Sequence, residues 1–326
     1  MSAGASVFVE APARLHFGVL DLRGALGRRF GGLGAAIPTP SLLLEVAPAR
    51  GGLTAEGPDA ERAAEFARRF LEHHRVRDGA RVVVHRPIPA HSGLGSGTQL
   101  GLAVARALAA LHGLPTEPTA LARAVSRGRR SAIGTWSFAL GGFILEGGRR
   151  PSDDGVAPLI GRYQVPESWR CVVAIPRGSP GLSGEAEAVA FAQLSPPPEG
   201  EAERVAHLVL MQLLPALVQG DIGSFGAALS EVQRITGAWF APQQGGVFAP
   251  GPGETLIRRL AEWGAAGVGQ SSWGPAVYGL VDGDVAGRSL ASRCREFLGG
   301  DGQVFEGGFA RSGARIGHGG PPPGND

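Results

Sequence analysis

A glycine-rich stretch between an apolar segment and an alanine-rich segment constrains the fold of this chain more than any other feature. Residues 82–84 are three valines, which is typical of a strand, and residues 100–112 have the spacing of a helix. Residues 92–99, between them, read Ser-Gly-Leu-Gly-Ser-Gly-Thr-Gln. A strand, a tight glycine turn and a helix in this order can present free backbone N–H groups to an anion.

We interpret this stretch as a phosphate-binding loop, and we expect Ser96 or Thr98 to cap the helix that follows it. The candidate binding residues are Ser92, Gly93, Gly95, Ser96, Gly97 and Thr98. A plain tight turn that leads into a helix is the alternative, because a Gly-x-Gly-x-Gly pattern is not specific by itself.

The chain contains no lysine, since all 31 residues counted as Lys and Arg are arginines. A Walker A phosphate loop requires a lysine, and so does Schiff-base catalysis, so both are excluded. A Rossmann fingerprint is not indicated either, because the glycine spacing Gly-x-Gly-x-Gly differs from the Gly-x-Gly-x-x-Gly of that motif.

Length and charge narrow the class of protein. The 326 residues suffice for one large or two medium domains, and 43% hydrophobic residues make a packed core feasible. A net charge of +2 argues against a nucleic-acid partner, and two distant cysteines argue against a disulfide framework or a metal cluster. No signal-peptide pattern or long apolar run is present, so we expect a soluble, cytoplasmic protein.

Polar residues also gather in three other segments. Arg14 and His16 lie two positions apart on an expected strand and share one face, and Asp21 follows them. Arg28 stands in a second glycine-rich stretch, and Arg129 in an arginine-rich segment. A structural histidine and solvent-exposed turns are the alternatives for these residues, while arginines grouped in this way favour phosphate binding.

The remaining pattern indicates a mixture of helices and strands. Strands are expected at 35–46, broken by two prolines, and at 169–176 and 304–309, and a turn and strand at 138–148. Helices are expected at 59–74, 119–127, 185–194, 201–219, 222–235, 254–263 and 285–298. Residues 311–326 are rich in glycine and proline, and we predict a disordered tail.

Three segments, at 12–15, 89–97 and 269–274, resemble in that order the three motifs of the GHMP superfamily of small-molecule kinases. The resemblance implies an α+β fold with two domains, at 1–160 and 161–310. The first would be like ribosomal protein S5 domain 2 and the second ferredoxin-like. It also assigns substrate binding to Ser271, Ser272 and Gly274 of the third motif.

A narrower resemblance is carried by 14–18 with Asp21, by 27–34, and by 127–143. These segments are similar to the β-ribofuranosylaminobenzene 5′-phosphate synthases, also called β-ribofuranosylphenol 5′-phosphate synthases. That family joins phosphoribosyl diphosphate to 4-hydroxybenzoate or 4-aminobenzoate and releases CO2 and diphosphate, early in tetrahydromethanopterin biosynthesis. The choice between the two benzoates stays open.

Two departures separate the chain from the kinases of this superfamily. Those kinases generally carry an aspartate base after the phosphate loop, whereas residues 129–142 contain no acidic residue. The third motif reads Gln-Ser-Ser-Trp-Gly instead of the kinases' glycine-rich form. An ATP-dependent small-molecule kinase is the second hypothesis, and a non-catalytic nucleotide-binding regulator is the third.

The synthase resemblance implies roles for the polar residues. Asp21 would hold Mg²⁺ or accept a proton, His16 would orient the aromatic acid or its hydroxyl, and Arg28 would neutralise a phosphate or the carboxylate. Arg14 and Arg129 would bind the same anionic groups, and Trp136 or Trp273 would stack on the aromatic ring, with core packing as the alternative. We expect a homodimer, the commonest closed symmetry.

Overall fold

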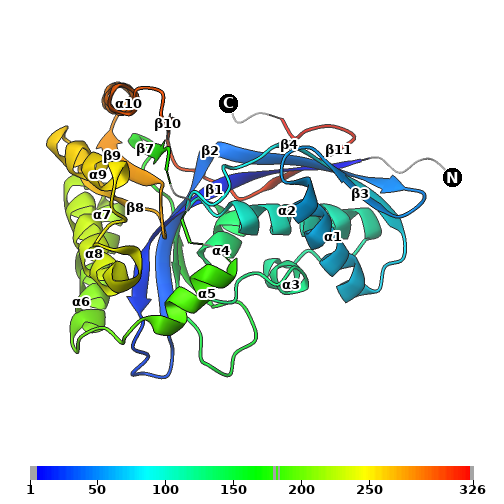
Figure 1. The fold of residues 1–326 in the computed structure, drawn as a ribbon, viewed down its shortest axis with the longest axis horizontal. Coiled ribbons are helices and arrows are strands. Elements are labelled where there is room, and N and C mark those ends of the chain that lie inside the picture. Colours follow the sequence, from blue (N-terminus) through cyan, green and yellow to red (C-terminus); the bar gives the residue numbers. More distant parts are fainter. Residues whose placement is uncertain (1–5, 179–180, 183, 324–326) are drawn as a thin grey trace.

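Seven strands form the N-terminal sheet of the computed structural model, which describes residues 6–178, 181–182 and 184–323 (Figure 1). The central path runs β11-β1-β2-β4-β3, and β5 pairs with β2 and β6. Helices α1–α4 lie along one side of the long β1–β2 pair in Figure 1. The strands are β1 (Val7–Asp21), β2 (Phe30–Ala49), β3 (Leu53–Glu56), β4 (Gly79–Arg86), β5 (Phe143–Glu146), β6 (Leu159–Tyr163) and β11 (Arg315–His318). The helices are α1 (Ala60–His74), α2 (Ser96–His112), α3 (Pro118–Ala124) and α4 (Ile133–Leu140).

Four antiparallel strands form the second sheet, in the order β10-β7-β9-β8. Helices connect β7 to β8 and β9 to β10, which is the ferredoxin-like arrangement that the resemblance implies. The strands are β7 (Trp169–Pro176), β8 (Gly267–Gln270), β9 (Val277–Asp282) and β10 (Gly302–Gly307). The helical segments are α5 (Gly184–Gln193), α6 (Glu201–Leu208), the π-helical turn η1 (Val209–Leu213), α7 (Leu214–Gln219), α8 (Ile222–Gln244), α9 (Pro252–Glu262) and α10 (Asp284–Leu298).

The glycine loop ends earlier than expected, because α2 begins at Ser96. Gly95 is the N-cap in a left-handed conformation (φ +77°), and no side chain caps the helix, so the prediction of a Ser96 or Thr98 cap is wrong. The N–H groups of Thr98 and Gln99 both bond the Gly95 carbonyl, which closes the first turn. The N–H groups of Ser96 and Gly97 precede this closed turn and have no acceptor within the helix.

Helix α4 occupies part of the segment where we expected only an arginine-rich stretch followed by a turn. Its buried residues include Ile133 and Phe138, and it packs against β1, β2 and α2. Small residues such as Gly134 allow this close contact, since a Cβ there would lie 2.9 Å from Thr98 Cγ2. The helix carries no charged residue and buries its two polar residues, Thr135 and Ser137, so it shows no clear amphipathic period and is hard to detect by periodicity alone.

Strand β2 continues through the two prolines that we expected to break it. The pairing with β1 shifts between Pro12 and Ala13, which stand opposite Ser41 and Ile37. Residues 38–40 therefore bulge out of the ladder, and the prolines, which lack an N–H group, cost no pairing there.

The prediction of a disordered tail is wrong for residues 311–323, and 324–326 lie outside the described residues. Strand β11 pairs antiparallel with β1, from Val7 opposite His318 to Glu10 opposite Arg315. Arg315 and Glu10 also form an ion pair, and Ile316 packs against the core. The N-terminal sheet thus takes its last strand from the end of the chain, and the domain boundary predicted at 160 falls inside β6.

We expect Gly34→Ala to destabilise the fold, because its Cβ would lie 2.3 Å from the Leu15 carbonyl oxygen and 2.5 Å from Ile133 Cγ2. The free energy of unfolding in urea should fall by at least about 1–3 kcal/mol. Gly178→Ala is the matched control, since its Cβ meets no described atom within 4 Å, and its effect should stay within about 0.5 kcal/mol. Equal midpoints for the two variants would contradict this packing.

Candidate active site

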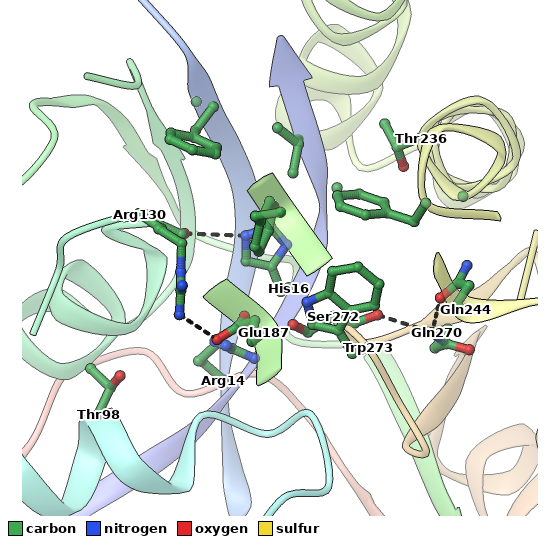
Figure 2. Close-up of a pocket in the computed structure, with 18 of the residues that line it drawn as sticks. Arg14, His16, Thr98, Arg130, Glu187, Thr236, Gln244, Gln270, Ser272 and Trp273 are labelled. Atoms are coloured by element: carbon green, nitrogen blue, oxygen red, sulfur yellow. Dashed lines mark hydrogen bonds and ion pairs between the residues drawn. The ribbon is translucent and has the colours of Figure 1, made fainter. Parts of the chain in front are cut away.

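A cavity of about 290 Å³ lies where β1, α5, α8, the 126–131 segment and the 270–273 loop meet. Figure 2 shows its lining: Arg14, Thr98 and Arg130 lie on one side, and Thr236, Gln244 and Trp273 on the other. His16 lies between the two groups (Figure 2). The cavity therefore has a basic end and an aromatic end.

Four arginines line the basic end, and two of them were predicted site residues. Arg14 and Arg129 line the cavity together with Arg127 and Arg130. Burial lowers the pKa of Arg14 and of Arg127 to about 10, so both remain charged at neutral pH. Arg130 forms an ion pair with Glu187 (2.6 Å), which leaves this end with a clear excess of positive charge.

The start of α2 adjoins this end. Thr98 lines the cavity, and the guanidinium groups of Arg62 and Arg127 lie beside Gly97, 2.6 and 3.1 Å from where its Cβ would stand. Among the described residues, Arg127 Nε is buried without a hydrogen-bond partner. Free N–H groups and two guanidinium groups at one helix N-terminus are suited to bind a phosphate.

The first two glycines of the loop lie so close to the Ser271 backbone and the Arg14 side chain that a larger residue would clash. A Cβ on Gly93 (φ +85°) would lie 2.2 Å from the Ser271 carbonyl oxygen, and a Cβ on Gly95 would lie 2.9 Å from Arg14 Cγ. Neither glycine lines the cavity, and neither does Ser96, which is half-buried at the start of α2. We expected these glycines to face a ligand, but they pack closely against the other two motifs instead.

Hydrogen bonds join the three predicted motifs. The Ser271 hydroxyl accepts from the His16 backbone N–H (2.9 Å) and donates to the Gly93 carbonyl (2.7 Å), to which Arg14 also donates. Ser92 is buried and donates to the Pro89 carbonyl (2.7 Å).

Only Ser272 of the predicted third-motif residues lines the cavity. Gly274 lies outside the lining, and its N–H bonds the Ser271 carbonyl, which closes the turn of this motif. The Ser271 hydroxyl thus joins the three motifs, while Ser92 and Gly274 stabilise the turns of their own motifs.

Aromatic rings form the opposite end. Trp273 contacts the edges of Phe191 and Phe240, with ring centroids 5.5 and 4.9 Å apart. Trp273 is 6% exposed and lines the cavity, whereas Trp136 does not line it and donates its indole N–H to the Ala157 carbonyl. Of the two tryptophans considered from the sequence, Trp273 is the one placed to meet a ring.

His16 is held neutral in the middle of the cavity. Burial, and then the nearby charge of Arg14, lower the pKa of His16 to about 3. Its Nε2 lies 3.1 Å from the Ser131 hydroxyl. A neutral imidazole can donate one hydrogen bond and accept another, which suits the orienting role expected of it.

Asp21 and Arg28 lie in the turn between β1 and β2, outside the cavity lining. The Asp21 carboxylate accepts the N–H groups of Arg23 and Gly24, which stabilises the turn. Arg28 forms an ion pair with Asp153, with 3.7 Å between a guanidinium nitrogen and a carboxylate oxygen. Asp21 pairs across the strands with Phe30, which does line the cavity, so the turn adjoins the site.

Several lining residues were missed from the sequence. Arg127 and Arg130 belong to the arginine-rich segment but were not selected, although their clustering was a usable signal. Glu187 and Gln233 come from α5 and α8, whose sequences contain no motif. Gln233 donates to the Phe17 carbonyl and accepts from the Gln270 N–H, so it joins β1 to the third motif.

Two further properties hold for the part of the chain that the structure describes. No group of three or more His, Cys, Asp or Glu side chains is placed to hold a metal ion. No described helix combines the length and the apolar character that a membrane crossing needs.

Comparisons with known proteins agree with the fold and with the motifs. The GHMP kinases N terminal domain matches residues 60–142, and the GHMP kinases C terminal domain matches 213–299. The beta-ribofuranosylphenol 5′-phosphate synthase of Methanothermobacter thermautotrophicus is 38% identical over 86% of this chain and 91% of its own length. The synthase of the same name from Archaeoglobus fulgidus is 32% identical over 86% and 90%.

Solved structures share the fold at low identity. A homoserine kinase from Cytophaga hutchinsonii aligns with a TM-score of 0.69 and 17% identity, covering 95% of this chain and 97% of its own. A mevalonate pyrophosphate decarboxylase from Streptococcus pyogenes aligns with a TM-score of 0.67 and 12% identity, covering 95% and 98%. These likenesses confirm the expected GHMP-type α+β fold.

The low pKa of His16 predicts a pH dependence of stability. Unfolded histidine takes up a proton below its ordinary pKa of 6.5, and folded His16 does so only near 3. Neutral His16 therefore contributes fully to the free energy of unfolding above pH 6.5. That contribution decreases as the pH falls towards 3, by up to about 1.4 kcal/mol per pH unit. Urea unfolding at several pH values should show that the free energy of unfolding decreases more steeply at acid pH for the wild type than for His16→Gln. Parallel curves would contradict the assignment.

Proposed function

Because this chain belongs to the β-ribofuranosylphenol 5′-phosphate synthase family, we propose that it transfers a phosphoribosyl group from phosphoribosyl diphosphate to 4-hydroxybenzoate or 4-aminobenzoate. The products are a C-riboside 5′-phosphate, CO2 and diphosphate, in an early step of tetrahydromethanopterin biosynthesis. The observation that carries the proposal is the two-ended cavity, which matches one highly anionic substrate and one aromatic substrate.

The basic end is suited to phosphoribosyl diphosphate. The α2 N-terminus with Arg62 and Arg127 offers one anion site, and Arg14 and Arg129 offer a second. Two sites are needed, because the donor carries a 5′-phosphate and a diphosphate on opposite sides of its ribose. Charge on the departing diphosphate grows as its bond to C1′ breaks, and fixed guanidinium groups stabilise that charge.

The aromatic end is suited to the benzoate ring. Phe191, Phe240 and Trp273 offer ring faces and edges, and Arg130 lies over the Phe191 ring (5.4 Å from its centroid). A ring held there directs its carboxylate towards the arginines. The ring carbon that bears the carboxylate then lies near C1′, as the reaction requires.

The bonds balance without a covalent enzyme intermediate. The C1′–oxygen bond to diphosphate breaks, and the ring carbon donates a π electron pair to form the new C1′–carbon bond. The bond between the ring and the carboxylate then breaks, its electrons restore the aromatic ring, and CO2 leaves. No lysine or other nucleophile is needed, in agreement with the lysine-free composition.

We include Mg²⁺ as a cofactor in this proposal. Glu187 is the one carboxylate on the described cavity lining, and Mg²⁺ often binds through one or two carboxylates together with substrate phosphates. The residues present therefore fit Mg²⁺ that enters with the diphosphate. When bound, the ion would offset charge on the leaving group. The proposal also includes Asp21 as a ligand of Mg²⁺ or a proton acceptor, and Arg28 as a group that neutralises a phosphate or the carboxylate. Both lie at the turn that adjoins the cavity.

We also retain a homodimer and a cytoplasmic location as parts of the proposal. Closed twofold symmetry is the commonest arrangement of soluble oligomers. Sedimentation velocity on the purified chain measures the first of these directly.

We expect purified protein with Mg²⁺, phosphoribosyl diphosphate and carboxyl-labelled 4-hydroxybenzoate to release CO2 and diphosphate in equal amounts. The same assay with 4-aminobenzoate identifies the preferred acceptor. ATP with a panel of small alcohols is the control for kinase activity. No turnover of either benzoate alongside ATP-dependent phosphorylation would overturn the synthase assignment, and nucleotide binding without any turnover would favour a regulator.

Trp273→Leu should raise the KM for the benzoate about three- to tenfold, because an aromatic contact contributes about 0.5–1.5 kcal/mol. The KM for phosphoribosyl diphosphate should change little. Trp136→Leu is the matched control, since Trp136 does not line the cavity, and it should leave both KM values near those of the wild type. Equal effects of the two variants on the benzoate KM would place the ring elsewhere.

A further inference from the structure

One face of α8 carries polar side chains to the aromatic end of the cavity. The lining residues of this helix recur at helical spacing: Gln233, Thr236, Gly237, Phe240 and Gln244. Figure 2 shows Thr236 and Gln244 on the side of His16 that is away from Arg130. The proposed reaction has so far given the polar groups of this face no role.

The Thr236 hydroxyl has acceptor capacity that the protein does not use. Thr236 is 3% exposed, and its Oγ1 donates its proton to the Val232 carbonyl one turn earlier in α8 (2.9 Å). Among the described residues, no donor bonds to Oγ1 in return. A hydroxyl oxygen has two acceptor positions, so both stay open. A buried oxygen of this kind on a cavity wall fits a ligand that supplies a hydrogen.

The chain also leaves space beside this hydroxyl. Gly18 of β1 lines the cavity, and a Cβ there would lie 3.3 Å from Thr236 Oγ1. The φ of Gly18 is +148°, in a region that residues with a side chain rarely adopt. Glycine at this position therefore keeps the Thr236 oxygen accessible from the cavity.

Two glutamines at this end likewise have only oxygen left to offer. Gln244 Nε2 donates to the Gly246 and Val247 carbonyls (2.9 and 2.8 Å). Gln270 Nε2 donates to the Ser272 carbonyl (3.0 Å) and to Gln244 Oε1 (3.2 Å). The backbone carbonyls fix which end of each amide is the nitrogen, and both N–H groups of each amide are used. Gln244 Oε1 keeps one lone pair.

The ring of the proposed aromatic substrate has two opposite ends as well. Its carboxylate and its 4-substituent lie across the ring from each other. With the carboxylate directed towards the arginines, the 4-substituent points towards Thr236 and Gln244. As the ring donates electrons to C1′, positive charge grows on the ring and on a hydroxyl or amino group at the 4-position. Fixed acceptor oxygens next to that group stabilise the charge.

We propose that Thr236 and Gln244 form the subsite for the 4-substituent of the aromatic acid and select a substituent that donates a hydrogen bond. This inference rests on the proposed function, which directs the carboxylate to the basic end. A hydroxyl group donates one hydrogen bond, to Thr236 Oγ1, and an amino group donates a second, to Gln244 Oε1. A fluorine has no hydrogen and leaves the buried Thr236 oxygen without a donor.

Calorimetric titration, with and without inorganic diphosphate, measures this selectivity without turnover. The wild type should bind 4-hydroxybenzoate and 4-aminobenzoate roughly three- to tenfold more tightly than 4-fluorobenzoate, which is the effect of one neutral hydrogen bond. Thr236→Val keeps the branched shape of the side chain and removes the oxygen. This variant should bind 4-hydroxybenzoate about as weakly as 4-fluorobenzoate, with the affinity for 4-fluorobenzoate unchanged.

Thr135→Val is the matched control. Thr135 is fully buried in α4, its hydroxyl has no partner among the described residues, and it does not line the cavity. This variant should keep the wild-type preference. Equal affinity of the wild type for 4-hydroxybenzoate and 4-fluorobenzoate would overturn the inference, and so would the same preference in Thr236→Val and Thr135→Val.

The transferase assay separates this inference from the proposed function. Thr236→Val should raise the KM for 4-hydroxybenzoate roughly three- to tenfold and leave the KM for phosphoribosyl diphosphate unchanged. Wild-type turnover with unselective binding of the three benzoates refutes the subsite alone. Selective binding of the hydrogen-bond donors without phosphoribosyl transfer refutes the proposed reaction alone, and neither binding nor turnover refutes both.

Discussion

The Ser271 hydroxyl is the contact on which the site depends. It accepts a hydrogen bond from the His16 backbone and donates one to the Gly93 carbonyl, so it joins three segments that are far apart in sequence. Arg14 donates to the same carbonyl. The hydroxyl is fully buried, where a hydrogen bond that loses its partner is costly. The positions of β1, the glycine loop and the third motif are therefore set together.

These hydrogen bonds give the glycines of the loop a structural role. Gly93 and Gly95 are needed because the Ser271 backbone and the Arg14 side chain occupy the space that a Cβ would fill. The proposed anion site then lies at the α2 N-terminus, where Gly97 stands beside the guanidinium groups of Arg62 and Arg127. The first two glycines of the loop therefore maintain its contact with β1 and the third motif.

Much of the architecture was predictable from the sequence. Helix α1, strand β7 and helix α10 agree closely with their hydrophobic patterns, since each buries one face or is buried throughout. Strand β11 and helix α4 were missed for opposite reasons. The first is too polar and glycine-rich to suggest a strand until it pairs with β1, and the second is too apolar to show a period. Both depend on neighbours from distant parts of the chain.

The site, too, was predictable from the sequence only in part. The sequence by itself determined the family motifs, the absence of lysine and the arginine-rich chemistry, because these depend only on which residues are present and on their spacing. Only the tertiary structure decided which of them meet: Arg14, His16, Thr98, Arg129 and Ser272 line the cavity, while Asp21 and Arg28 lie at an adjoining turn. It also brought in Glu187 and Phe191 from α5. The physical reason is that a carboxylate or a ring acquires its role from burial and from its neighbours, and packing between segments far apart in the sequence sets both.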